Sequence, residues 1–278
     1  MIAAIGELVL DVTISPGGEL RPDDDQDAEI TIGGGGQAAN FCAWAASLGE
    51  PARLLTRVGD DEAGRRLVAE LEESGVEVRA ARGGQPTGAI AVLLGPRGER
   101  TFARRRGAST GLRPEHVEES WLDGVRLLHV PAYALFQEPL GSAARRAVEI
   151  GQARGALVSV DLSSAADLRE YGGSRLADEL ARRPPDLLFA SEAEAAEVPV
   201  RLEELARVPV VKLGARGCLL FGRRIPSPVV REVDGNGAGD AFAAAFCVSY
   251  LEGATPLEAA GRAVLVAARA VTTPGARP

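Results

Sequence analysis

A glycine-rich segment, Val233–Phe242, has the sequence VDGNGAGDAF and could carry chemistry. The apolar run Val229–Val233 predicts a strand before the turn, and an apolar helix is predicted after it. Backbone N–H groups of such a turn lie at the positive end of the helix and form an anion site. The carboxylate of Asp240 would repel a phosphate bound at this site. Its position is therefore explained if it has to take a proton from the attacking nucleophile. A helix cap, worth about 0.3–1 kcal/mol, is the alternative role, and the pattern alone leaves both open.

A second glycine-rich segment, Gly33–Asn40, has the sequence GGGGQAAN and leads into an alanine-rich stretch. Its first six residues fit the G-x-G-x-x-A spacing of a dinucleotide-binding turn, and Asp60 lies about twenty residues further along. That fingerprint requires a buried first strand directly before the turn. Glu29–Ile32 instead follows a long polar stretch, and the natural first strand, Ile2–Val9, leads into Asp11. We therefore reject the dinucleotide interpretation.

The segment that ends at Asp240 resembles the C-terminal signature of the ribokinase-like (PfkB) carbohydrate kinases, D-T-x-G-A-G-D. Gly235 stands where that family has threonine, and the other fixed positions match. The resemblance implies that Asp240 is the catalytic base and that Asp234 belongs to a loop that binds a monovalent cation. It also implies an anion hole formed by the backbone of Gly237, Ala238 and Gly239.

The Gly33–Asn40 segment resembles the N-terminal signature of the same family, G-G-x-x-A-N with a further glycine nine residues later. Asp11 resembles the family's aspartate that binds two substrate hydroxyls. A carboxylate suits vicinal hydroxyls because it accepts two hydrogen bonds in its plane. Without the resemblance, Asp11 would be interpreted as a turn residue after a strand. The resemblance assigns the remaining sugar contacts to Gly35, Gly36 and Asn40.

Three further segments resemble the nucleotide side of these kinases. Ser191-Glu-Ala-Glu194 takes the place of the family's N-x-x-E, in which the glutamate organises magnesium through water. Glu194 is therefore the magnesium candidate, and Ser191 replaces the usual asparagine in the ATP site. Thr272–Ala276 resembles the segment that closes over the adenine. A strand and turn resemble the contacts to the ATP phosphates, which implies roles for Lys212, Gly214 and Gly217.

Short apolar runs alternate with helical periodicity through most of the chain. This alternation predicts βαβ units in one mostly parallel sheet with helices on both faces, a three-layer α/β/α sandwich of the ribokinase-like type. The predicted strands are Ile2–Val9, Arg53–Val58, Arg126–Val130, Ala156–Asp161, Leu187–Ala190, Val208–Leu213 and Cys218–Phe221. The predicted helices are Gln37–Leu48, Glu62–Ser74, Pro139–Ala153, Leu176–Arg182, Ala238–Leu251 and Pro256–Val271.

Two stretches, about 12–33 and 88–105, break the alternation and predict a small β-sheet lid on a single kinase domain that spans residues 1–278. The β-like runs are Glu29–Ile32, Ala89–Leu94 and Arg100–Ala103, with a hairpin turn at Gly95–Gly98. A sheet this thin cannot bury both faces. We therefore expect an apolar patch and a homodimer through the lid, with the patch formed by Ile30, Ile32, Ile90 and Val92.

Three consecutive arginines, Arg104, Arg105 and Arg106, follow the last lid strand. A run of like charges is most often a solvated face. Alternation along a strand would place Arg104 and Arg106 on one face and Arg105 on the other. An inward-facing pair would suit an anionic acceptor, because the arginine fork matches a carboxylate or a phosphate. We keep Arg104 and Arg106 as candidate substrate residues.

Composition restricts the class of protein. Apolar residues make up 46% and charged residues 25% of the chain, as expected for a soluble globular protein with a full core. The net charge of −8 argues against a nucleic-acid partner, which would require a basic face. The most apolar run near the end, Ala263–Val271, is interrupted by arginine, and no targeting signal opens the chain. We expect no membrane segment and a cytoplasmic location.

The motifs together imply ATP-dependent phosphorylation of a hydroxyl of a small carbohydrate, such as ribose, fructose or 2-keto-3-deoxygluconate. ATP and Mg²⁺ are the implied cofactors, with K⁺ as a further candidate at the Asp234 loop. A nucleoside kinase of the same fold is the first alternative, and a non-catalytic sugar-binding protein is the second. The acceptor is not fixed by sequence, because one fold and one base serve many alcohols.

Overall fold

The main sheet is buried on both faces, and its strands alternate between two cores. In β1 (Ile2–Ile5), Ile2 and Ala4 pack into one core while Ala3 and Ile5 pack into the other. This follows from the two-residue repeat of a strand. Burial on both faces explains the continuous apolar runs in the sequence. The computed structural model describes residues 1–95 and 100–278.

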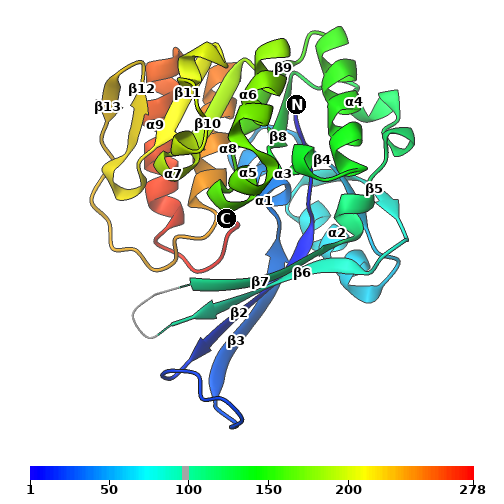
Figure 1. Cartoon of the computed structure of the whole chain (residues 1–278), viewed down its shortest axis with the longest axis vertical. Helices are drawn as coiled ribbons and strands as arrows, with labels where there is room; N and C mark the ends of the chain where they lie inside the picture. Colours follow the sequence, from blue (N-terminus) through cyan, green and yellow to red (C-terminus); the bar gives the residue numbers. More distant parts are fainter. Residues whose placement is uncertain (96–99) are drawn as a thin grey trace.

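Within the described residues, nine strands form this sheet in the spatial order β13-β12-β11-β10-β9-β8-β1-β4-β5 (Figure 1). Neighbouring strands are parallel from β5 to β11, and β12 and β13 are antiparallel to their neighbours. The predicted mostly parallel sheet is confirmed. The other strands are β4 (Ala52–Val58), β5 (Val76–Arg82), β8 (Leu127–Pro131), β9 (Leu157–Asp161), β10 (Leu187–Ser191), β11 (Val208–Lys212), β12 (Cys218–Leu220) and β13 (Arg223–Ile225).

Helices cover both faces of the sheet, which confirms the three layers (Figure 1). One core holds side chains from α1 (Gln37–Ser47), α2 (Glu62–Glu73), α8 (Ala238–Leu251) and α9 (Pro256–Ala270). The other core holds side chains from α3 (Tyr133–Phe136), α4 (Leu140–Ala153), α5 (Ala165–Tyr171) and α6 (Gly173–Arg182), with α7 (Glu192–Ala196) at its edge. None of the helices in the described parts of the chain is long and apolar enough to cross a bilayer.

A smaller sheet of order β3-β2-β6-β7 projects from one end of the body as the predicted lid (Figure 1). Its central pair, β2 and β6, is parallel, and both outer pairs are antiparallel. The lid therefore occupies residues 9–35 and 87–107, somewhat more than the predicted 12–33 and 88–105. Most of the predicted hairpin turn, Gly95–Gly98, lies outside the described residues. The lid strands are β2 (Val9–Pro16), β3 (Ala28–Gly35), β6 (Thr87–Leu94) and β7 (Arg100–Gly107).

The prediction of one continuous strand over Ile2–Val9 is wrong, because β1 ends in the main sheet and β2 begins in the lid. The chain turns between the sheets at Gly6, where an added Cβ would lie 2.7 Å from the Tyr133 hydroxyl. The N–H of Glu7 donates to that hydroxyl (3.0 Å). The break thus delivers Glu7 and Asp11 to the space between the two sheets.

The lid has an inner and an outer face, and strand register corrects the predicted apolar patch. The inner face contains Asp11 opposite Ile90, and Val92 opposite Phe102. Ile30 and Ile32 lie on the outer face, 57% and 53% exposed, whereas Val92 is only 4% exposed. Ile90 and Val92 therefore do not belong to the outer patch, because successive residues of a strand face opposite sides. The outer face instead combines Ile30 and Ile32 with Val12, Ile14, Ala91 and Leu93.

The predicted strand Val229–Val233 is also wrong, because this segment forms no regular element. Pro226 and Pro228 stand just before it, and neither has an N–H for a ladder hydrogen bond. Val229 is fully exposed. The N–H of Val233 instead donates to the carbonyl of Val271 (2.7 Å), which links the loop to the chain after α9.

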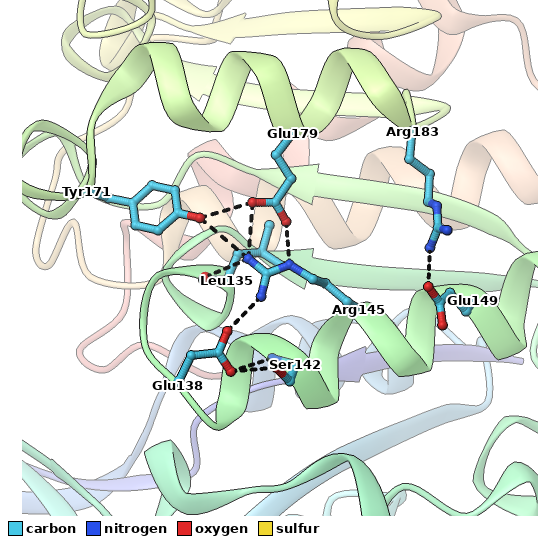
Figure 2. A network of polar contacts seen from close by, with 8 residues as sticks. All are labelled: Leu135, Glu138, Ser142, Arg145, Glu149, Tyr171, Glu179 and Arg183. Carbon is cyan, nitrogen blue, oxygen red and sulfur yellow. Dashed lines mark hydrogen bonds and ion pairs between the residues drawn. The ribbon is translucent and has the colours of Figure 1, made fainter.

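A polar network joins the helices on the α4 side of the sheet (Figure 2). The guanidinium of Arg145, on α4, donates to Glu179 on α6 through Nε (2.7 Å) and to Glu138 through Nη1 (2.9 Å). Its Nη2 group also donates to the carbonyl of Leu135 in α3 (3.2 Å). Tyr171 of α5 donates its hydroxyl to Glu179 (3.0 Å). Arg145 of α4 is thus linked to α3, α5 and α6.

We expect Arg145→Met to lower the free energy of unfolding by about 1–3 kcal/mol, since it leaves partly buried acceptors without their charged donor. Arg183→Met is the matched control, because Arg183 forms an exposed pair with Glu149 (3.1 Å) in the same view (Figure 2). An exposed pair of this kind contributes less than about 1 kcal/mol. Urea denaturation measures both, and equal losses would contradict the structural role of Arg145.

Candidate active site

Two adjoining cavities lie at the carboxyl ends of the main-sheet strands. The first, which we call the lid cavity, has a volume of about 540 Å³ and is lined by the inner face of the lid and by the body. The second, the body cavity, has a volume of about 330 Å³ and is lined largely by apolar side chains of α8, α9 and the loop before α8. Lys212, Gly214 and Gly239 line both, so the cavities meet at these residues.

Asp240 lies in the first turn of α8 and lines the lid cavity. The side chain of Asn40, from α1, donates from Nδ2 to Oδ2 of Asp240 (3.0 Å). Burial raises the pKa of Asp240 to about 7, against the lowering effect of the Asn40 hydrogen bond. Gly237, in the left-handed conformation, is the N-cap residue of α8, and Asp240 caps nothing among the described residues. Asp240 is the acidic residue in the first turn of α8, so its position suits the positive end of the helix as well as a role as base.

The turn before α8 brings its backbone to the junction of the cavities. Gly237 and Gly239 line the lid cavity, and Ala238 and Gly239 line the body cavity. The first N–H groups of a helix have no partner within the helix and carry partial positive charge. The three residues predicted to form an anion hole thus lie between the two spaces.

Lys212, at the end of β11, forms an ion pair with Asp161 at the end of β9 (Nζ to Oδ2, 2.5 Å). Burial lowers the pKa of Lys212, but Asp161 and Glu194 reverse this effect and raise it overall. Lysine therefore stays charged where the cavities meet. Asp161 was not among the predicted site residues, although it ends an apolar strand just as Asp11 follows one.

Glu194 and Ser191 form the N-terminal cap of α7. Glu194 accepts from the N–H of Ser191 (2.7 Å), and the Ser191 hydroxyl accepts from the N–H of Glu194 (3.3 Å). Both line the lid cavity, so Ser191 lies beside the predicted metal ligand rather than in the body cavity. Burial raises the pKa of Glu194, with Lys212 opposing this effect.

The donors around Glu194 fit a magnesium ion held mainly by water and phosphate. In the described residues there is no cluster of three or more carboxylate, histidine or cysteine ligands. Mg²⁺ seldom uses such a cage and more often binds one or two carboxylates together with water and substrate phosphates. Glu194 and Asp161 are carboxylates that line the same cavity, close to its junction with the body cavity.

Asp234 lies in the loop before α8 and accepts hydrogen bonds from the backbone of two segments. It accepts from the N–H of Asn236 (2.9 Å) and from the N–H of Gly275 (3.0 Å). The backbone of Val271 accepts from the N–H groups of Val233 and Asp234. The loop predicted to hold a monovalent cation is thus joined to the chain that follows α9.

The acceptor-side residues predicted from sequence come together at the root of the lid. Asp11, Gly36 and Asn40 line the lid cavity. Gly35 lies against Asp11, and a Cβ there would lie 2.1 Å from the carboxylate, so any larger residue would displace the Asp11 side chain. Oδ1 of Asp11 is buried and finds no hydrogen-bond donor in the described parts of the chain. Burial raises the pKa of Asp11 to about 6, against the effect of Arg277.

Arg104 and Arg106 share the inner face of the lid, as predicted, with Arg105 opposite. Both pair with Asp167 of α5, Arg104 through Nη1 (2.9 Å) and Arg106 through Nη2 (2.6 Å). Arg106 also pairs with Glu7 and is only 13% exposed, so the solvated-face alternative is wrong for it. Its guanidinium lies 4.6 Å from the ring centre of Tyr133.

Gly214 and Gly217 line the body cavity, with Val264, Ala268 and Val271 from α9 and the chain after it. An apolar slot that ends at a lysine and a helix N-terminus is suited to a flat ring with an anionic tail. Sequence inspection missed Glu7, Asp161, Asp167 and Arg277 as site residues. Among these, Asp161 alone stood at a predicted strand end.

Comparison with known proteins agrees with this geometry. The family model described as pfkB family carbohydrate kinase matches residues 1–278. Fructokinase-1 of Oryza sativa subsp. japonica is 32% identical over 231 residues, or 76% of this chain and 72% of that protein. The 2-dehydro-3-deoxygluconokinase of Thermoproteus tenax is 30% identical over 99% of this chain and 89% of its own length.

Solved structures show the same arrangement of body and lid. An E.coli protein assigned as ribokinase II, solved in complex with ATP and Mg²⁺, superposes with a TM-score of 0.87 at 26% identity. The match covers 99% of this chain and 94% of the E.coli chain. The chain belongs to the pfkB family of carbohydrate kinases.

Proposed function

We propose that this protein transfers the γ-phosphoryl group of ATP to a hydroxyl of a sugar or sugar acid, with Asp240 as the general base. The observation that carries the proposal is the position of Asp240. It is a partly buried carboxylate with a pKa of about 7, next to the helix N-terminus where the two cavities meet. A base with a pKa near neutrality has the correct protonation state and enough driving force for proton transfer.

In this mechanism, the adenine of ATP lies in the body cavity and its phosphates lie at the N-terminus of α8. The acceptor lies in the lid cavity, where the orphan oxygen of Asp11 and the side chain of Asn40 bind its hydroxyls. Asp240 takes the hydroxyl proton as the oxygen attacks phosphorus. Lys212 and the amides of Gly237–Gly239 stabilise charge on the transferring group. Magnesium, when bound near Glu194 and Asp161, neutralises phosphate charge.

The lid favours a polar acceptor with several hydroxyls. Its inner face supplies Asp11, Arg104 and Arg106, and the body supplies Asn40 and Asp161. The relatives named fructokinase and 2-dehydro-3-deoxygluconokinase act, by name, on a neutral sugar and on a sugar acid. Because Asp167 and Glu7 compensate much of the arginine charge, a neutral sugar fits the site as well as an acid.

A nucleoside acceptor is the second candidate, and one observation favours it. Phe102 on the inner face of the lid is 57% exposed and lines the lid cavity together with Ile90 and Val92. An exposed aromatic ring above the acceptor site could stack on a nucleobase. Binding of a purine analogue in competition with sugar would support this function, and failure of nucleosides to compete would remove it.

Asp240→Asn is expected to lower kcat by roughly 10²–10⁴, the usual contribution of a positioned base, with ATP binding unchanged. Because the base works only when deprotonated, wild-type kcat/KM should rise with pH through about 7, where the raised pKa of Asp240 lies. Asp178→Asn, on the exposed side of α6, is the matched control. More than a tenth of wild-type activity in Asp240→Asn would remove Asp240 from the mechanism.

Activity should require magnesium and should be lost in excess chelator, because the phosphate charge would then be only partly neutralised by Lys212 and the α8 amides. Potassium is expected to stimulate the enzyme through the loop around Asp234. Gly235 stands where threonine is usual in the family, so potassium independence would reject only the cation role of this loop. Full activity in chelator would contradict the kinase proposal itself. ATP-consumption assays with added K⁺ or Na⁺ measure both effects.

If the lid arginines recognise an anion, Arg104→Ala or Arg106→Ala should raise KM about ten- to a hundredfold for 2-keto-3-deoxygluconate but not for fructose or ribose. Arg105→Ala, on the outer face, is the matched control. Circular dichroism should accompany Arg106→Ala, which leaves the buried Glu7 without its partner. Equal effects on neutral and acidic acceptors would show that the arginines do not select charge.

The exposed outer face of the lid, which includes Ile30 and Ile32, is proposed as a homodimer interface. Sedimentation velocity at micromolar concentration should detect a dimer, and Ile32→Asp should dissociate it because a charge would be buried at the contact. Glu29→Lys, on the opposite face of β3, is the control. A monomeric wild-type protein would reject this interface.

A further inference from the structure

Arg277 lies behind the lid cavity and contacts two residues of the acceptor site. Its Nε donates to Oδ1 of Asn40 (3.1 Å), and its Nη2 donates to the carbonyl of Gly35 (3.0 Å). A side chain at Gly34 would collide with the same guanidinium. Gly34 pairs with Leu10 on the outer side of the lid, so Arg277 approaches Asn40 from behind rather than through the cavity.

The chain after α9 brings Arg277 to this place through several backbone anchors. Val271 accepts from the N–H groups of Val233 and Asp234, and the N–H of Gly275 donates to Asp234 (3.0 Å). The indole N–H of Trp44 on α1 donates to the carbonyl of Ala276 (3.0 Å). Because the backbone just before Arg277 is held at Gly275 and Ala276, the guanidinium of Arg277 has few positions open to it beside Asn40.

The chemistry of the two side chains fixes the orientation of the Asn40 amide. A guanidinium has donors only, and an amide has one acceptor oxygen and one donor nitrogen. With Oδ1 of Asn40 turned toward Arg277, Nδ2 is turned toward Asp240. A half-turn of the amide would set donor against donor at Arg277 and oxygen against carboxylate at Asp240. Arg277 thus selects the orientation in which Asn40 donates to the base.

We propose that Arg277 is a positioning residue for phosphoryl transfer, which holds the Asn40 amide in the orientation that donates to Asp240 and ties it to the lid root at Gly35. The proposal rests on the proposed function of Asp240 as the base. It assigns Arg277 no contact with ATP, so loss of Arg277 should lower kcat and leave the KM for ATP unchanged, whereas the KM for the acceptor, which Asn40 binds, can rise.

Other charged groups also act on Asp240 and stay unchanged in the test. Asp161 and Asp11 raise its pKa, and Lys212 lowers it. The Tyr133 hydroxyl and Arg277 itself lie close enough to interact with it electrostatically. Loss of Arg277 would let Oδ1 of Asn40 turn toward the carboxylate, and the pKa of Asp240 would then rise further.

The experiment compares Arg277→Met with Arg269→Met, an exposed arginine on α9 that serves as the control. We expect Arg277→Met to raise the pKa of Asp240 by roughly one unit and therefore to lower kcat at pH 7 by about fivefold, with most of the activity recovered at high pH. Carbon-13 NMR of labelled aspartate follows the titration directly, with Asp240→Asn giving the assignment. Arg277→Lys, which keeps one donor and the charge, should recover part of the loss.

A double-mutant cycle with Asn40→Ala separates orientation from charge. If Arg277 acts through Asn40, Arg277→Met should change kcat and the pKa of Asp240 much less in the Asn40→Ala background than in the wild type, and only the direct electrostatic effect of Arg277 on Asp240 should remain. Additive effects, or an Asp240 titration unaltered by Arg277→Met alone, would overturn the proposal. If Arg277→Met does not fold, Arg277→Lys and Arg277→Gln in the same cycle decide it. A wild type that phosphorylates no sugar or nucleoside would reject the proposed function, and the NMR titration would still test Arg277.

Discussion

A carboxylate base that works beside a triphosphate must be poorly hydrated, so that its pKa lies near neutrality. It must also not repel the phosphate. Asp240 meets both conditions through its surroundings. Burial disfavours its charged form, and Asn40 keeps a donor on one oxygen. In the proposed mechanism, the ammonium group of Lys212 and the N-terminus of α8 lie on the side of the phosphates, where their positive charge opposes the repulsion. The glycines before α8 and the chain that folds back from α9 both serve to fix this one carboxylate.

Much of the fold and the centre of the site could be predicted, because their signals are local. Two-sided burial gives continuous apolar runs, and these located most strands of the main sheet. Asn40 and Asp240 stand within glycine-rich segments and Asp11 follows the first predicted strand, and the structure brings all three to one cavity. Lys212 and Glu194 follow strands whose carboxyl ends meet at the same edge of the sheet.

The remaining features depend on contacts that no local pattern contains. Arg106 meets Asp167, and Arg277 meets Asn40, across 61 and 237 residues of sequence. Ile90 and Val92 were wrongly assigned to the outer patch because the face on which a residue lies depends on the register between strands. The sequence does not contain the register of β2 with β6. Val229–Val233 has the composition of a strand, but the prolines before it remove ladder donors.

The lid is joined to the body by four short crossings, at residues 6–8, at Gly36, at 83–86 and at Gly107. All four crossings lie at the same end of the lid strands, so these connections would allow the lid to rotate about that end more readily than to slide over the body. Asp11, Arg104 and Arg106 would travel with the lid, whereas Asn40 and Asp240 would stay on the body. In the proposed function, the acceptor would therefore contact both the lid and the body. A change in the angle between lid and body would then change the distance between the acceptor hydroxyls and Asp240.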